Sequence, residues 1–254
     1  MKGQWIGRIR GNMEGQVIVN IDDLGKNYSG EAFVVPDNKG LPSSVAIFVT
    51  PDKKTNTSFK ALTMPLHPIT GIITPWTEIQ NLYPGVNHSK EVTIDLRFEE
   101  NELHLKATTD LRINVMSDLS KKPFSFTSDI KGDMKTWEQY KTFVSELLGQ
   151  GKLFRGQREP WKLRTAFHRK GRYSLFRFEG DDVPLLYRRL SARTSHVFNL
   201  DMPNAKGAFL NLAQHHGYPT PLLDWTYSPY AAAFFAFRGV PKNNKAEENV
   251  SLHI

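Results

Sequence analysis

The sequence predicts an α+β protein of two domains, an all-β antiparallel domain over residues 1–128 and a mixed α/β domain over residues 129–254. Three observations predict this division. Apolar residues alternate with polar ones in the first part, they recur at helical spacing in the second, and the excess of basic residues lies in the second. We expect the first domain to be a meander forming a small sandwich or barrel that serves recognition or scaffolding.

The alternation of apolar and polar residues is strongest between residues 92 and 107. Apolar and polar side chains alternate over residues 92–98, the polar segment 99–101 turns the chain, and alternation resumes over residues 103–107. This pattern is typical of antiparallel strands with one solvated face. The same reasoning predicts strands at residues 5–9, 17–21, 28–35, 45–49 and 111–115.

Helical spacing begins after residue 135. Thr136 and Gln139 are placed to form a capping box in front of an amphipathic run at residues 137–148. Two further helices are expected at residues 185–197 and 204–216, each with its apolar residues on one face.

A fourth helix is expected to begin at Ser228 as the N-cap, with Pro229 in its first turn. Because residues 230–237 are apolar on every side of the helix, we expect it to be buried. An apolar strand at residues 222–223 precedes it, and another strand is expected at residues 250–254.

The composition excludes several classes of protein. A hydrophobic content of 39% excludes a disordered chain, and the absence of cysteine excludes disulfide frameworks and thiolate zinc sites. No apolar run is long enough to span a bilayer, and residues 1–5 do not resemble a secretory signal. We therefore expect a cytoplasmic protein without a membrane partner.

The charge is concentrated in one segment. The chain has 33 basic and 26 acidic residues, and residues 152–193 alone contain 12 basic and 4 acidic ones, a net charge of +8. This pattern fits either a solvated basic face or a polyanionic partner, which would be a nucleic acid or a phosphate-bearing small molecule. The residues expected to contact a nucleic acid are Lys162, Arg164, Arg169, Arg188 and Arg189.

Three segments of the second domain have residues suited to a binding or catalytic site. In Phe154-Arg155-Gly156, the arginine is suited to bidentate phosphate binding and the glycine allows close approach of the backbone. In residues 213–220, His216 continues the apolar stripe of its helix, so we expect its ring to face the core or a cleft. Neighbouring His215 points about 100° away around the helix, so no metal site is expected.

The third segment is residues 222–229, Leu-Leu-Asp-Trp-Thr-Tyr-Ser-Pro, in which Asp224, Thr226 and Ser228 surround the start of a helix. A helix N-terminus offers unpaired N–H groups and the positive end of the helix dipole. The segment is either an elaborate N-cap or part of a site.

Together these three segments resemble the FRG domain, a family whose motifs occur in the same order over roughly residues 135–254. The segment is also similar, more weakly, to the arginine–serine–glutamate class of ADP-ribosyltransferases, which use NAD. That resemblance implies an ADP-ribosyltransferase-like fold. Because the fold needs more strands than residues 131–254 provide, we expect the domain to continue beyond the given chain.

The second resemblance also implies site residues. Arg155 would hold a phosphate of NAD, with Gly156, Gln157, Trp225 and Ser228 as further cofactor contacts. His216, Asp224 and Thr226 would form the catalytic set. No glutamate stands at the family's catalytic position, because Glu247 and Glu248 lie in a polar loop.

The leading hypothesis is therefore an NAD-dependent ADP-ribosyltransferase-like toxin or antiphage effector. Its acceptor would be RNA or another nucleic acid, and a protein inhibitor or antitoxin would be its partner. The alternatives are a non-catalytic nucleic-acid or nucleotide binding module and a protein-interaction module in which the aromatic cluster is merely core.

Overall fold

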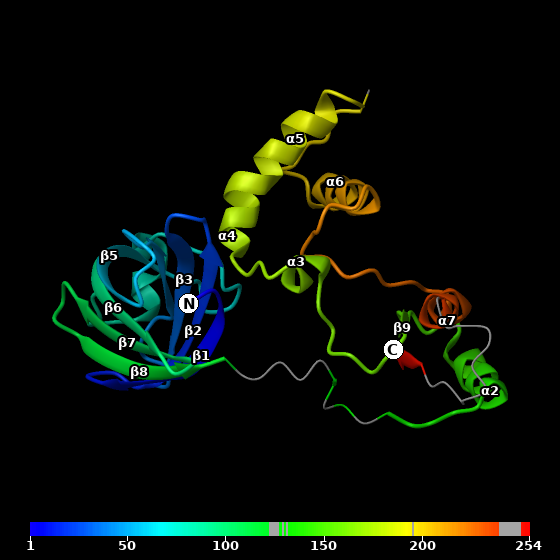
Figure 1. Cartoon of the computed structure of the whole chain (residues 1–254), viewed down its shortest axis with the longest axis horizontal. Coiled ribbons are helices and arrows are strands. Elements are labelled where there is room, and N and C mark those ends of the chain that lie inside the picture. The colour runs from blue at the N-terminus through cyan, green and yellow to red at the C-terminus, as the bar shows by residue number, and fades with distance from the viewer. Residues whose placement is uncertain (122–126, 129, 131, 195, 239–249) are drawn as a thin grey trace. The chain divides into compact units, whose positions relative to one another are not determined.

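The computed structural model describes the whole chain except residues 122–126, 129, 131, 195 and 239–249 (Figure 1). It forms two compact units, residues 1–123 with 170–199 and residues 124–169 with 200–254. The elements of the first unit are β1 (Gly3–Gly11), β2 (Gly15–Asp23), β3 (Tyr28–Pro36), β4 (Ser44–Val49), β5 (Asn56–Pro65), α1 (Trp76–Ile79), η1 (Gln80–Leu82), β6 (Glu91–Glu99), β7 (Glu102–Thr109), β8 (Asn114–Ser120), α4 (Leu175–Arg177), η2 (Phe178–Asp182) and α5 (Val183–Ser191). Those of the second are α2 (Trp137–Leu147), β9 (Arg155–Gln157), α3 (Ala166–Arg169), α6 (Pro203–His215), α7 (Pro229–Phe237) and β10 (Ser251–His253).

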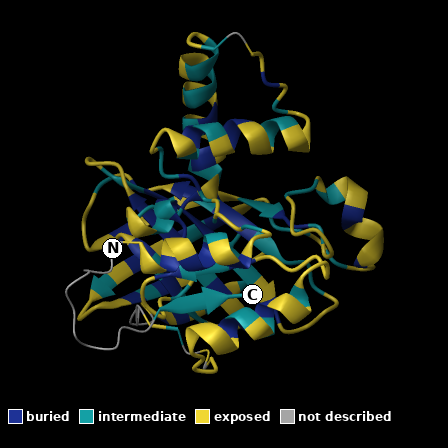
Figure 2. Ribbon diagram, turned by 90° about the vertical axis from the view of Figure 1, so that its right-hand side faces the viewer, coloured by how far each residue is buried: buried dark blue, intermediate teal, exposed yellow. Residues whose placement is uncertain are grey.

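Strands β1 to β8 form a closed antiparallel barrel in which each strand pairs with the next and β1 pairs with β8 (Figure 1). Closure leaves no unpaired edge in this sheet. The period-two pattern of the sequence places apolar side chains inside, and Figure 2 shows the buried residues of the strands in dark blue. The expectation of a sandwich or barrel is thus resolved in favour of the barrel.

Large side chains fill one end of the barrel. Trp5 is fully buried, donates from its indole Nε1 to the carbonyl oxygen of Met1 at 2.7 Å, and packs edge-on against Phe98 with 5.6 Å between ring centroids. Phe48 and Phe59 form a second aromatic pair with centroids 5.0 Å apart. Aromatic pairs of this kind stabilise a core beyond the area that they bury.

Residues 170–199 belong to the barrel unit, and α4 lies against the outer face of β3. The backbone N–H of Tyr173 donates to the buried carboxylate of Asp22 at 2.9 Å, and the ring of Phe176 stacks on Phe33. Glu31, which lies on the same strand as Phe33, is 1% exposed. This segment therefore seals an acidic side chain against the sheet.

Burial raises the pKa of Glu31 to about 7, and the neighbouring Asp22 adds to the rise. The hydroxyl of Ser174 and the backbone N–H groups of Leu175 and Phe176 oppose the rise. Neither carboxylate oxygen has a hydrogen bond of good geometry, so the opposing effect is partial.

In the second unit, the short strand β9 pairs with β10 in antiparallel register and packs against helix α7. The approach is closest at Gly156, where an added Cβ would lie 1.9 Å from the carbonyl oxygen of Ala232. Helix α2 joins this core, because the hydroxyl of the buried Tyr140 donates to the carbonyl oxygen of Pro229 at 2.9 Å. The capping box of Thr136 and Gln139 is present as predicted.

The predicted ADP-ribosyltransferase-like α/β fold of the second domain is wrong for the described residues. Its strands there are β9 and β10, three residues each, and the rest is helix and irregular chain. The expected strand at residues 222–223 is absent, because only Thr226 forms a bridge, to Phe154. The apolar residues of this half lie at helical spacing, which does not build a broad sheet.

Four single elements also differ from expectation. Helix α7 is buried on one face only, because Phe234 is 62% exposed and its neighbouring aromatic residues are exposed as well. The strand expected at 111–115 begins instead at Asn114, after a turn in which Arg112 has a positive φ of 60°. Strand β5 was missed, and helix α5 ends at Ser191, so that Val197 lies outside it.

No helix in the described parts of the chain is both long and apolar enough to cross a bilayer.

We expect the barrel unit to lose stability as the pH rises through Glu31. Its folded pKa of about 7 lies above the ordinary value of 4.5, so the folded state is favoured below pH 4.5 and this contribution is lost between about pH 4.5 and 7. The loss is on the order of 3 kcal/mol. Replacement of Glu31 by Gln should remove this pH dependence in denaturant unfolding, whereas the exposed Glu14→Gln control should keep it. An unchanged pH profile in Glu31→Gln would contradict the burial described here.

Substitution of Gly156 by Ala should destabilise the second unit by at least about 2 kcal/mol, because its Cβ would collide with the backbone of α7. The matched control is Gly207→Ala in α6, where an added Cβ meets nothing within 4 Å and should stabilise by about 0.5–1 kcal/mol. Thermal unfolding followed by circular dichroism measures both. Equal stability of the two variants would show that the β9–α7 approach is not as close as described.

Candidate functional site

A pocket of about 470 Å³ opens in the second unit where β9 meets α7. Many of its lining side chains are polar or aromatic. Half of the lining residues belong to the first and third sequence motifs. The lining residues are Phe154, Arg155, Gly156, Gln157, Arg158, Trp161, Arg169, Asp224, Trp225, Thr226, Ala232 and Phe235.

Backbone pairing brings the two motifs together. The N–H of Phe154 donates to the carbonyl oxygen of Thr226 at 2.7 Å, and the N–H of Thr226 donates back at 2.9 Å. Phe154 is buried and anchors this pair in the core with Ala232 and Ala233. As a result the next residue along β9, Arg155, lies beside the segment that begins at Asp224.

Arg155 is held in place by one backbone contact and keeps donors free for another. Its Nη1 donates to the carbonyl oxygen of Asp224 at 2.6 Å, whereas its Nε is buried without a hydrogen-bond partner. A buried donor of a charged group is costly unless it is paired. The pocket therefore has a cationic group that an anionic ligand would satisfy.

The surroundings of Arg155 disfavour the charged form of its guanidinium. Burial lowers the pKa of its guanidinium, the nearby Asp224 opposes that change, and the like charge of Arg169 adds to it. Arg169 itself lines the pocket and donates from its Nη1 to the carbonyl oxygen of Arg164 at 2.6 Å. Two neighbouring cations in one pocket favour a ligand with at least one negative charge.

Asp224 is oriented by a chain of side-chain hydrogen bonds. The amide Nε2 of Gln214 donates to its carboxylate, and the hydroxyl of the fully buried Thr220 donates to Oε1 of the same glutamine. Gln214 and Thr220 belong to the second sequence motif. The three motifs thus meet here, with the second motif supporting the pocket from behind.

Gln157 and His253 complete the wall formed by the two short strands. Nε2 of Gln157 donates to the carbonyl oxygen of Trp161 at 2.8 Å and lies 3.0 Å from Nε2 of His253. Burial and the charge of Arg155 lower the pKa of His253, which favours a neutral ring that accepts this second hydrogen bond.

The structure brings together six of the eight predicted catalytic and cofactor residues in the lining of this pocket. These are Arg155, Gly156, Gln157, Asp224, Trp225 and Thr226. Ser228 lies outside the lining as the N-cap of α7, where its hydroxyl accepts from the N–H of Ala231 at 3.2 Å. Its backbone N–H donates to the hydroxyl of Thr226, so it supports the turn.

The eighth residue, His216, is placed differently. It caps the C-terminus of α6 and is exposed, so the expectation that its ring faces the core or a cleft is wrong. The helix ends one residue earlier, and Gly217 turns the chain with a positive φ of 84°. Because the backbone departs from helical geometry at His216, its ring does not continue the apolar face of α6.

The five residues predicted to contact a nucleic acid are divided between the two units. Lys162, Arg164 and Arg169 belong to the second unit, whereas Arg188 and Arg189 are exposed on α5 of the barrel unit. Clustering in the sequence therefore does not by itself define one basic surface.

Several lining residues were missed by sequence reasoning as cofactor contacts, and the clearest is Arg158. It follows β9 directly, so its position two residues beyond the Arg-Gly dipeptide was the available signal. Phe235 was assigned to a buried helix, and nothing in the sequence separated it from the core residues of α7.

Within the described ranges, no group of three or more histidine, aspartate or glutamate side chains is arranged to hold a metal ion. Glu247 and Glu248, which are not expected to supply the catalytic glutamate, lie outside the described residues.

Comparison with known families matches residues 150–245 to the FRG domain. No curated protein and no solved structure matches the chain. The matched range contains all three motifs and all the lining residues of the pocket, whereas the resemblance to ADP-ribosyltransferases finds no support in these comparisons. The resemblance expected from the three motifs is confirmed, because residues 150–245 of this chain match the FRG domain family.

Proposed function

We propose that the pocket around Arg155 binds the phosphate group of a nucleotide, with NAD as the first candidate. The observation that carries the proposal is the guanidinium of Arg155, which lines the pocket together with a second cation, Arg169, and whose Nε has no hydrogen-bond partner in the protein. A guanidinium in a partly desolvated pocket pairs well with phosphate oxygens.

Two aromatic side chains support a nucleotide over a bare anion. Trp161 and Trp225 line the same pocket and are 44% and 39% exposed, so their rings are accessible to a planar base. The volume of about 470 Å³ lies within the range of small-molecule sites, which is about 300–1,000 Å³. A ring and an adjacent phosphate are the parts of a nucleotide that this lining matches.

ADP-ribosyl transfer is the second candidate, and the observation that favours it is the oriented carboxylate of Asp224 in the same pocket. Cleavage of the bond between nicotinamide and ribose develops positive charge on the sugar, which a nearby carboxylate stabilises. The acceptor of this proposed activity is a nucleic acid. The role as a toxin or antiphage effector held by a protein inhibitor is part of this second candidate and rests on the family resemblance alone.

Substitution of Arg155 by Ala should weaken NAD binding about 10- to 100-fold, because a charge-assisted hydrogen bond contributes roughly 1.5–3 kcal/mol. Calorimetric titration of NAD into the full chain measures this loss. Arg10→Ala, on an exposed position of the barrel, removes the same charge and should leave binding unchanged. Titration of AMP tests whether one phosphate and one base suffice. Absence of binding by both nucleotides, or equal binding by the Arg155 variant, would overturn the proposal.

Substitution of Asp224 by Asn separates the two candidate functions. The amide oxygen can still accept from Gln214 and the backbone carbonyl can still hold Arg155, so NAD binding should change less than about threefold. If the carboxylate stabilises the developing positive charge, release of nicotinamide from NAD in the presence of RNA should fall at least about 100-fold. If Asp224→Asn released nicotinamide at the rate of the unaltered protein, Asp224 would be excluded as the carboxylate that stabilises the developing charge. If neither protein released nicotinamide, nucleotide binding would remain as the function.

A further inference from the structure

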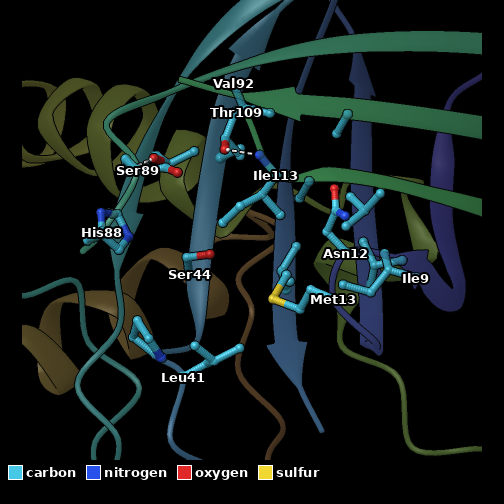
Figure 3. A pocket seen from close by; sticks show the side chains of 18 of the residues that line it. Ile9, Asn12, Met13, Leu41, Ser44, His88, Ser89, Val92, Thr109 and Ile113 are labelled. Atoms are coloured by element: carbon cyan, nitrogen blue, oxygen red, sulfur yellow. Dashed lines mark hydrogen bonds between the residues drawn. The ribbon is translucent and has the colours of Figure 1, made fainter. Parts of the chain in front are cut away.

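The barrel contains a cavity of about 310 Å³ that is separate from the pocket of the FRG domain (Figure 3). It is lined by side chains that point inward from the strands and by residues of four connections, β1–β2, β3–β4, β5–β6 and β7–β8. In an up-and-down barrel these four connections lie at the same end. The cavity therefore occupies one end of the barrel, opposite the end filled by Trp5 and Phe98.

The cavity arises from the size of the inward-facing residues. Ala32, Ala46 and Ala107 stand at interior positions in this half, whereas the same strands β4 and β7 carry Phe48 and Leu103 towards the other end. Barrels of eight strands have an interior that side chains either fill or leave open for one small ligand. Here one half is filled and the other half is left open.

The lining is mostly apolar and carries no ionic side chain among its described residues. Among the described residues that line the cavity there is no lysine, arginine, aspartate or glutamate, and the single titratable side chain is that of His88. Burial lowers the pKa of His88, although Asp110 opposes this, and its ring lies against Trp76 at 5.6 Å between centroids. An imidazole of this kind is a neutral hydrogen-bonding group at neutral pH.

Hydrogen-bonding groups gather at the loop end of the cavity. Figure 3 shows the side chains of Asn12, Ser44, His88 and Ser89 around it, with Ile9 and Met13 contributing apolar surface. The hydroxyl of Thr109 is already engaged, because it accepts from the N–H of Ile113 at 3.2 Å. A ligand would thus meet apolar surface at depth and hydrogen-bonding groups near the loops.

We propose that the barrel is a binding site for a neutral, mostly apolar small molecule with one hydrogen-bonding head group. Its apolar body lies between Ala32, Ala46 and Ala107, and its head group lies near His88. An apolar cavity of about 150 Å³ takes up benzene, so a cavity of about twice that volume suits a body of roughly ten heavy atoms. The absence of a cation among the described lining residues selects an alcohol or a similar neutral group over a carboxylate.

The test is calorimetric titration of the full chain with octan-1-ol and, separately, with octanoate. The proposal expects octan-1-ol to bind with a dissociation constant below 1 mM and octanoate to bind at least tenfold more weakly. Absence of octan-1-ol binding at 1 mM would overturn the existence of the site, and equal or stronger binding of octanoate would overturn its selectivity for neutral ligands.

Two variants locate the site. Ala46→Phe should fill the cavity and weaken octan-1-ol binding at least tenfold, whereas Val49→Phe, on an exposed position of the same strand, should leave it unchanged. Ala107→Leu fills the cavity from β7 and provides the same test should Ala46→Phe fail to fold by circular dichroism. Retention of full affinity in a folded cavity-filling variant would overturn the proposal. Arg155→Ala should bind octan-1-ol normally, which keeps this result independent of nucleotide binding.

Discussion

The pair of backbone hydrogen bonds between Phe154 and Thr226 is the contact on which the FRG site depends. It joins two segments that are far apart in the sequence, and it sets the Arg-Gly dipeptide beside the Asp-Trp-Thr turn. Gly156 extends the same constraint, because only a residue without a Cβ allows β9 to lie so close to Ala232 of α7. Arg155 is then left with its side chain directed into a pocket that these backbone contacts define.

The surroundings of Arg155 are unfavourable for its positive charge, because the guanidinium is partly desolvated. Desolvation disfavours the charged guanidinium, and Arg169 adds repulsion, while the carbonyl oxygen of Asp224 compensates only one donor. Energetically unfavourable charges of this kind are concentrated at functional sites. Glu31 of the barrel unit is almost completely buried, and there the unfavourable charge is relieved by protonation near pH 7 instead.

The two ends of the barrel interior differ in how densely side chains pack there. The end with Trp5, Phe48 and Phe98 is packed with large aromatic rings, which contribute to the hydrophobic core of the barrel. The other end places alanine at several inward positions and retains a cavity. A rigid hydrogen-bonded wall allows this, because the strands are held by their ladders even where side chains do not meet across the centre.

The elements that depend on local rules could be predicted from the sequence. Alternation of apolar residues predicted most strands of the barrel, the Thr136–Gln139 pair predicted a capping box, and Ser228 with Pro229 predicted the start of α7. The motif order also predicted the FRG domain, and six of the eight proposed catalytic and cofactor residues do line one pocket.

The remaining features could not be predicted from local patterns, because they depend on contacts between residues that are distant in the sequence. Closure of the barrel requires β1 to pair with β8, which no local pattern encodes. The exposure of His216 follows from where α6 ends, and the exposure of Phe234 follows from which face of α7 meets β9. Periodicity reports which residues share a face of an element, whereas the partner that covers the face is chosen by packing across the whole chain.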